Sequence, residues 1–349
     1  MRGSVWRNVL LSVLVSGAFL WAAFRGVSFA DVLEQLRHTD PFWLSVTIGI
    51  SFLIMLFRAW RWQLELRPLE HVPLGRLWTI IAVAYMCINL LPVRLGEVVR
   101  PWLLSRRSSV KFSNVVGNLV VEKTMDSVVL LLYMIVGLLS VSNLPVWVRR
   151  GALFPAVIAG MMVLLVALVW WRGESFVGDR VLAFLPERFR SGLQKVLVAI
   201  RDGMKILPNP LLLSSVFVVS LALWFLPILS SWAMIQAFGF DVPFGAAVAV
   251  FIFIGFGTAL PNAPGMIGVF QYACVLALGL FGIEQSRAAA YGVVLNAVQF
   301  LTLILQGVIA LPLAGVSLRD LRNAAAPPRD ETASADESGA SGHRETLSS

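Results

Sequence analysis

The chain has 349 residues, of which 58% are hydrophobic and only 14% are charged, and its formal net charge is +8. Soluble domains carry roughly 25% charged residues, so this composition argues against an ordinary soluble protein. Several apolar runs approach the roughly 20 residues needed to cross a bilayer. The sequence therefore predicts an all-α, polytopic helical membrane protein.

Six apolar runs predict full membrane spans. They cover residues 9–24, 41–57, 127–141, 152–171, 211–238 and 288–313. The first run is expected to be a retained helix rather than a cleaved signal peptide, because no convincing small-residue cleavage site follows Trp21 and further spans come after it. We expect these spans to form one transmembrane domain over residues 1–318.

Lysine and arginine residues gather in blocks between the apolar runs. The blocks lie at 2–7, 58–76, 94–111, 172–205 and from Arg319 onward. Such blocks face the cytoplasm, so both termini are expected there, in a protein of the cytoplasmic membrane. Because the basic residues follow the membrane topology, no nucleic-acid partner is predicted. The one local exception to this charge pattern is the pair Arg149 and Arg150, which lies in a loop expected to face outward.

The segment 77–91 is apolar but short for a span, and basic blocks flank it on both sides. Both of its ends should therefore lie at the cytoplasmic face, which requires the chain to turn back inside the membrane. Pro92 and Gly96 supply the break, since proline removes an amide donor and glycine tolerates unusual backbone angles. We predict a re-entrant helical hairpin here.

In the basic block before this segment, Arg58, Arg61 and Trp62 are expected to be anchors at the membrane edge.

A second hairpin is predicted in the other half of the chain, where segments 244–260 and 266–281 flank Pro261, Pro264 and Gly265. The charge pattern places its ends on the outer face. Two broken segments in corresponding places of two halves indicate a binding site near the middle of the membrane. The fold prediction is thus six full spans plus two re-entrant hairpins in an inverted-repeat arrangement.

The halves are expected to cover residues 1–171 and 211–318. The linker, 172–210, mixes charges with apolar residues at helical spacing, which is typical of an amphipathic helix on the inner membrane surface. The segment 319–349 is polar and rich in Ser, Asp, Glu and Gly, so we expect a disordered cytoplasmic tail.

Ionisable residues concentrate near the first break and in the next helix. They are Arg94, Glu97, Arg100, Glu122, Lys123 and Asp126. Charges at depth in a membrane usually mark function, but Glu97 with Arg100, and Lys123 with Asp126, have the spacing of self-neutralising pairs. One interpretation is that all six attach the hairpin to the helix. The other is that Arg94 and Arg100 bind a lipid phosphate, which a guanidinium grips with two parallel hydrogen bonds.

The second break carries no charge. Its polar and small residues are Gly255, Gly257, Thr258, Asn262, Gly265, Gly268 and Gln271. Amide groups of a broken helix can bind a headgroup there, or the glycines only permit close helix packing. Asn296, in the middle of the last span, predicts an interhelical hydrogen bond. Cys87 and Cys274 fall in apolar stretches and are expected to be packing residues. No metal site, cofactor or soluble-enzyme motif is indicated.

Three ordered motifs resemble a known family over residues 9–313. They are Pro92, Arg94, Gly96, Glu97 and Arg100; then Glu122, Lys123 and Asp126; then Pro261, Pro264, Gly265 and Gly268. This pattern resembles the lysylphosphatidylglycerol synthase transmembrane-domain family of flippase-like integral membrane proteins. The resemblance implies movement of lipids or lipid-linked sugars between leaflets. In that family a separate soluble domain performs the synthesis, and none follows residue 313, so we expect no synthase activity.

Two positions depart from the family pattern. The family usually has Arg where this chain has Lys123 and a glutamate where it has Gln271. Lysine keeps the charge but loses the bidentate geometry, and loss of the glutamate favours an anionic or neutral lipid substrate.

The sequence hypothesis is therefore a lipid translocase for a phosphate-bearing lipid. The alternatives are a membrane-embedded transferase that acts on a lipid-linked substrate, with Glu97 or Asp126 as base, and an accessory subunit of a separate lipid-modifying enzyme. A homo-oligomer is left open as a further possibility.

Overall fold

The computed structural model describes residues 14–25, 34–35, 37–90, 96–110, 112–140, 146–151, 153, 156–168, 171, 209–258 and 263–315. Within these residues all regular structure is helical. The labelled elements are α3 (Pro41–Leu66), α4 (Leu74–Leu90), α5 (Gly96–Ser105), α6 (Phe112–Ser140), α7 (Val146–Gly151), α10 (Pro210–Ala237), α11 (Gly245–Thr258), the short 3₁₀ helix η3 (Pro264–Met266), α12 (Val269–Gly279) and α13 (Gln285–Leu313). Two further helices run over Leu14–Phe24 and Ala156–Leu168.

Three of the described helices, α3, α10 and α13, are long and apolar enough to cross a membrane. The expected class, a helical membrane protein, agrees with this finding. Residues of three other expected spans fall in the helix Leu14–Phe24, in α6 and in the helix Ala156–Leu168. The count of six spans stays a prediction.

The long helices α3 and α10 begin with the same local signal, a polar cap followed by proline. The Asp40 carboxylate accepts a hydrogen bond from the Phe42 amide at 2.8 Å, and the Asn209 side chain accepts one from the Leu212 amide at 3.0 Å. Proline suits the first helical turn because the amide it lacks has no partner there. The two helices pack against each other, and the Asp40 amide donates to the Ala237 carbonyl at 2.8 Å, so the start of α3 meets the end of α10.

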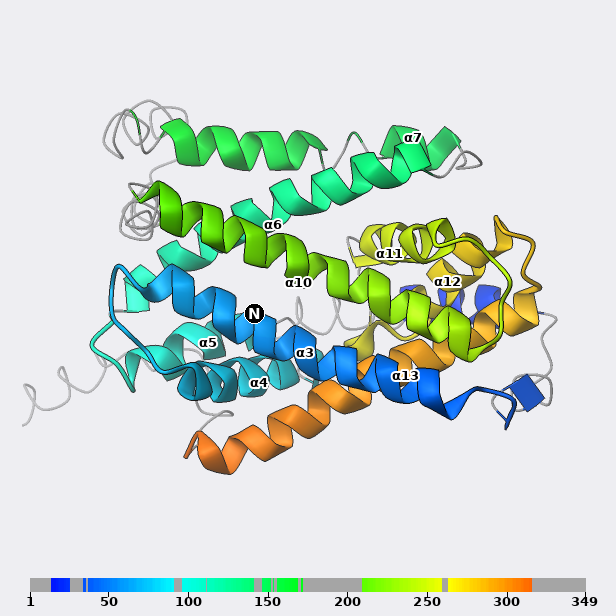
Figure 1. Ribbon diagram of the computed structural model, residues 1–349, viewed down its shortest axis with the longest axis horizontal. Helices are drawn as coiled ribbons and strands as arrows, with labels where there is room; N and C mark the ends of the chain where they lie inside the picture. The colour runs from blue at the N-terminus through cyan, green and yellow to red at the C-terminus, as the bar shows by residue number, and fades with distance from the viewer. Residues whose placement is uncertain are drawn as a thin grey trace, which may run out of the picture.

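Two pairs of shorter helices occupy opposite ends of the bundle (Figure 1). The first pair is α4 with α5, and the second is α11 with α12, and within each pair the helices pack against each other. Helix α4 also contacts η3, at the turn of the second pair. The first pair therefore reaches the turn of the second in the middle of the bundle.

The breaks occur where the prolines and glycines predicted them. Helix α4 ends at Leu90 and α5 begins at Gly96, while α11 ends at Thr258 and η3 begins at Pro264. After Pro264 the backbone takes φ values of 73° at Gly265 and 89° at Gly268, which side chains with a Cβ rarely adopt. Pro92 and Pro261, also expected at the breaks, lie outside the described residues.

Glycines on α13 let it lie close to both helix pairs. A Cβ added at Gly292 would be 3.1 Å from the Cα of Gln271 and from the Cβ of Cys274, and one at Gly307 would overlap the side chain of Met86. Cys87 and Cys274 are buried free thiols, which confirms their predicted packing role. The predicted linker, 172–210, lies outside the described residues except for its last two, and the predicted tail, 319–349, lies wholly outside them.

The contact between α13 and α4 predicts a packing defect for Gly307→Val. Because Met86 meets this glycine with its own Cβ, the clash cannot be relieved by a rotamer change alone, and overpacking of this kind costs about 1–3 kcal/mol. We expect a lower thermal unfolding midpoint for the purified protein in detergent. Gly49→Val is the matched control, since a Cβ at Gly49 meets nothing within 4 Å; equal midpoints for the two variants would contradict the packing described here.

Candidate functional site

A cluster of five charged side chains lies buried where α3, α5 and α6 meet. Its members, with their exposed fractions, are Arg61 (3%), Glu65 (2%), Arg100 (7%), Glu122 (2%) and Asp126 (7%). We call these five residues the buried charge cluster. Taking such charges out of water costs several kcal/mol per ion unless each is paired and hydrogen-bonded, so their contacts decide what the cluster can do.

Arg61 is the centre of the cluster. Its guanidinium donates to Asp126, forms an ion pair with Glu122 at 2.9 Å (Nη2 to Oε1), and lies 3.5 Å from Glu65 (Nε to Oε1). One guanidinium has five N–H donors in a planar fork, and here it faces three carboxylates. Arg61 thereby attaches α3 to α6.

Arg100 supplies the second buried cation and attaches α5 to α6. Its Nη1 lies 2.7 Å from Oε2 of Glu122, and its Cζ lies 3.9 Å from the centre of the Trp62 ring. The indole of Trp62 in turn donates to Asn118 at 3.1 Å. The guanidinium is thus neutralised by a carboxylate and covered by an aromatic face.

Helix α10 contributes one neutral donor and one neutral acceptor to the cluster. The indole of Trp224 donates to Oδ1 of Asp126 at 2.7 Å, and the Ser220 hydroxyl lies 3.5 Å from Nη1 of Arg61. Asp126 therefore has two donors from different helices. Four helices meet at this group of contacts, three from the first half of the chain and one, α10, from the second.

Of the two interpretations of the charged residues, these contacts favour the structural one for Arg100, Glu122 and Asp126. Arg100 pairs with Glu122 across two helices, so it is not an unpaired cation. The expected pairing of Lys123 with Asp126 is wrong, because Lys123 is exposed while Asp126 binds Arg61.

The other predicted residues of the first half are not placed by the structure. Arg94 lies outside the described residues, and Glu97 lies in α5 without a described side chain. Their roles stay predictions.

The sequence analysis missed the central residues of the cluster. Arg61 is only 3% exposed and Trp62 is 0% exposed, so their predicted role as membrane-edge anchors is wrong. A signal was present: Arg61 and Glu65 are four residues apart at the end of an apolar run, which places them on one helix face. What it could not reveal was that the remaining partners come from residues 61 and 65 positions later in the chain.

Arg58 is a half-buried arginine one turn before Arg61 on α3. Its guanidinium stacks on the Tyr85 ring of α4, with Cζ 4.0 Å from the ring centre, and its Nε is buried without a hydrogen-bond partner. Among the side chains that the structure describes, which do not include that of Glu97, no carboxylate lies within ion-pair distance of Arg58. This side chain was predicted to be an anchor, but its ring contact places it beside the first helix pair.

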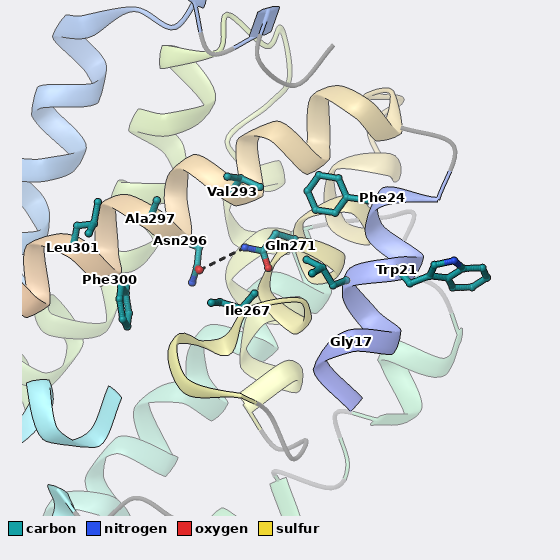
Figure 2. A pocket seen from close by; sticks show the side chains of 11 residues that line it. Gly17, Trp21, Phe24, Ile267, Gln271, Val293, Asn296, Ala297, Phe300 and Leu301 are labelled. Atoms are coloured by element: carbon teal, nitrogen blue, oxygen red, sulfur yellow. Dashed lines mark hydrogen bonds between the residues drawn. The ribbon is translucent and has the colours of Figure 1, made fainter. Parts of the chain in front are cut away.

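In the second helix pair, the predicted polar residues bind one another. Gln271 accepts a hydrogen bond from the Gly268 amide at 2.7 Å, and its Nε2 lies 3.5 Å from Oδ1 of Asn296 (Figure 2). Asn296 donates to the Gly265 carbonyl at 3.0 Å, which confirms its predicted interhelical bond. These amides hold the turn of the second pair against α13. Asn262 lies outside the described residues.

Beside this turn lies a groove with a cavity volume of about 670 Å³. It runs between the helix Leu14–Phe24, the start of α12 and α13, and its lining is apolar except for Gln271 and Asn296 (Figure 2). Trp21 and Leu301 at its rim are each 63% exposed. The helix Leu14–Phe24 is attached here as well, since the Ser16 hydroxyl accepts from the Ala263 amide at 2.7 Å and a Cβ on Gly268 would overlap the Ser16 carbonyl.

Long apolar helices around a buried charge cluster, with an apolar groove at the surface, define an integral helical membrane protein. The family model described as the lysylphosphatidylglycerol synthase TM region matches residues 9–307. The chain belongs to this family, as its motifs predicted.

Several archaeal membrane proteins are similar to this chain over most of their length. One UPF0104 membrane protein of Methanothermobacter thermautotrophicus is 22% identical over 315 residues, covering 83% of this chain and 90% of the relative. A second from the same organism is 23% identical over 338 residues, covering 87% and 92%. A UPF0104 membrane protein of Methanocaldococcus jannaschii is 24% identical over 228 residues, covering 64% and 92%. No solved structure gives a significant match.

The central position of Arg61 predicts a large loss of stability for Arg61→Met, because the change leaves buried carboxylates without their main cation. Breaking a buried pair in this way costs about 3–5 kcal/mol. We expect a sharply lower yield of monodisperse protein and a lower unfolding midpoint, whereas Arg106→Met, at an exposed arginine, should behave like the parent. Adding Glu65→Gln and Asp126→Asn to Arg61→Met should restore part of the loss. If Arg61→Met alone were as stable as the parent, the structural role of the cluster would be contradicted.

The amide contacts of the second turn predict a local effect for Asn296→Leu. The change leaves the Gly265 carbonyl without its donor, at a cost of about 1–3 kcal/mol. We expect faster hydrogen exchange in residues 263–271, measured by mass spectrometry. Gln299→Leu, which places the same side chain on α13 three residues later, is the control; faster exchange in both variants, or in neither, would show that the Asn296 contact does not hold the turn.

Proposed function

We propose that this protein is a lipid translocase that moves a phosphate-bearing lipid between the leaflets of the cytoplasmic membrane. In this proposal six helices cross the membrane, α4–α5 and α11–α12 re-enter it from opposite faces, and both termini lie in the cytoplasm. No synthase activity is proposed for the chain.

The observation that carries the proposal is the meeting of the two helix pairs. They enter the bundle from opposite ends, and α4 contacts η3 in the middle (Figure 1). Non-helical backbone at membrane depth is tolerated only where protein buries it or where it lines a wet cavity. Broken helices that meet near the midplane form the substrate sites of many secondary transporters, and the apolar groove beside η3 suits an acyl chain.

We assign the headgroup phosphate to Arg58 rather than to Arg100. Arg100 is already paired with Glu122, whereas Arg58 stacks on Tyr85 and has no ion pair with any carboxylate whose side chain is described. Stacking holds the plane of a guanidinium and leaves its N–H edges available for two parallel bonds to phosphate. Arg94, in the motif that ends the first segment, stays the second predicted contact.

The transferase alternative is less well supported. A general base must be able to accept a proton from the substrate, but Asp126 is 7% exposed and already accepts from Arg61 and Trp224. One of the two carboxylates predicted as base is thus occupied by structural contacts, and the side chain of the other, Glu97, is not described.

Transport by purified protein in proteoliposomes tests the proposal. The assay follows fluorescent phosphatidylglycerol and phosphatidylcholine by reduction of the dye in the outer leaflet. The parent should accelerate exchange over protein-free vesicles. Absence of acceleration for both lipids would end the proposal. A covalently altered lipid would favour the transferase, and a co-purified enzyme without transport would favour the accessory subunit.

Arg58→Met should slow this transport while leaving the protein folded. Hydrogen bonds to charged groups contribute about 1.5–3 kcal/mol, so we expect exchange about 10- to 100-fold slower than the parent. Arg58→Lys should lie between the two because it keeps the charge but not the fork, and Arg106→Met is the control. Exchange at the parental rate in Arg58→Met would show that this guanidinium does not bind the headgroup.

A further inference from the structure

The buried charge cluster does not balance. Its five members include two guanidiniums, Arg61 and Arg100, and three carboxylates, Glu65, Glu122 and Asp126, each at most 7% exposed. Within these five side chains, three negative charges against two positive ones leave one negative charge in excess. Arg58, one turn earlier on α3, is half-buried and stacks on Tyr85, so it is not a member of the cluster. An excess charge in a buried site is so costly that the group takes up a proton instead.

Glu65 is the carboxylate that the cluster leaves unsatisfied. Glu122 pairs with both arginines, and Asp126 accepts from Arg61 and Trp224. Both oxygens of Glu65 are buried without a hydrogen-bond partner, and its nearest cation is Nε of Arg61, at 3.5 Å. For a carboxyl group that is 2% exposed and has no hydrogen-bond donor, the charged form is strongly disfavoured relative to the neutral acid.

In the part of the chain that the structure describes, the surrounding helices offer no further cation to Glu65. Helix α10, which packs along α3, has no titratable side chain. Helix α4 has three titratable side chains. Tyr85 covers Arg58, Cys87 is a buried thiol, and Arg76 donates to the Arg107 carbonyl. Helix α13 has Arg287 and Tyr291 in its first turns, and Arg287 stacks on Phe240.

The charged residues of α5 and α6 leave the count unchanged. On α6, Lys123 is exposed, and Glu122 and Asp126 are already counted. On α5 Arg100 is paired, and the side chain of Glu97 is not among those described.

We propose that Glu65 is a proton-binding site that couples lipid translocation to a proton gradient. The inference rests on the proposed function. Glu65 lies one residue before the end of α3 at Leu66, and Arg67, the first residue after the helix, is exposed, so solvent reaches the chain two residues after Glu65. The proton comes from water there and converts the carboxylate to the neutral acid.

The same geometry gives the direction of coupling. Arg58 lies three residues before Arg61, about one turn earlier on α3, so a phosphate held by Arg58 adds a negative charge at the neighbouring turn of the same helix. A further anion beside a cluster that already has excess negative charge favours the protonated form of Glu65. By linkage, the proton favours phosphate binding equally. We therefore expect the lipid phosphate and the proton to bind together on one side of the membrane. On the other side they leave together, the phosphate to the lipid leaflet and the proton from Glu65 to water, as in a symporter.

The test measures the steady-state distribution of fluorescent phosphatidylglycerol across proteoliposomes with an imposed pH gradient and the membrane potential clamped at zero. If one proton accompanies each lipid, the ratio between leaflets shifts about tenfold per pH unit, toward the alkaline side. Glu65→Gln should show the ratio found without a gradient. Glu70→Gln, at a carboxylate bound to Ser109 near the same end of α3, should shift like the parent.

The outcomes separate this inference from the proposed function. A parent that equilibrates the lipid but ignores the gradient, or a Glu65→Gln variant that responds like the parent, overturns proton coupling and leaves the translocase intact. If the parent moves no lipid, infrared spectroscopy of the folded protein still tests the site. The absorption of a protonated carboxyl group, present in the parent and lost in Glu65→Gln, would support proton binding at Glu65, and its absence from the parent would refute it.

Discussion

The fold depends on burying the Arg61 guanidinium among carboxylates that neutralise its charge. Arg61 is surrounded by three carboxylates from two helices, with a second arginine and an indole completing the arrangement. In hydrocarbon or protein interior an uncompensated charge is far more costly than a lost apolar contact. Helices α3, α5, α6 and α10 are therefore not free to slide independently, because any shift that separates Arg61 from Glu122 or Asp126 exposes a buried charge to an apolar environment.

The two helix pairs are held by different chemistry. The first is attached by charged contacts, from Arg100 to Glu122 and Trp62, whereas the second is held by neutral amides and by close packing at glycines. A hydrogen bond between neutral groups contributes about 0.5–1.5 kcal/mol net, and one to a charged group about 1.5–3 kcal/mol. The two pairs therefore differ in how strongly they are attached to the rest of the bundle.

Much of the plan was accessible from the sequence because it follows from local rules. Apolar runs gave the class of protein, and proline with glycine marked the ends of α4 and α11 within a few residues. The site could be predicted from the sequence only in part. Glu122 and Asp126 were identified as important, but spacing speaks only to neighbours three or four residues away. Their true partners, Arg61 and Trp224, lie 61 and 98 positions along the chain, and only tertiary packing brings them together.

The bond between the Ser16 hydroxyl and the Ala263 amide joins residues 247 positions apart. A ribosome makes Ser16 long before Ala263 exists, so during biosynthesis the helix Leu14–Phe24 must wait for most of the chain before it can dock. Closing so long a loop is slow, since the entropy loss is incurred before the contacts form. The earliest helix in the described part of the chain therefore cannot take its place in the groove before residue 263 has been made, and shorter nascent chains contain this helix without its partner.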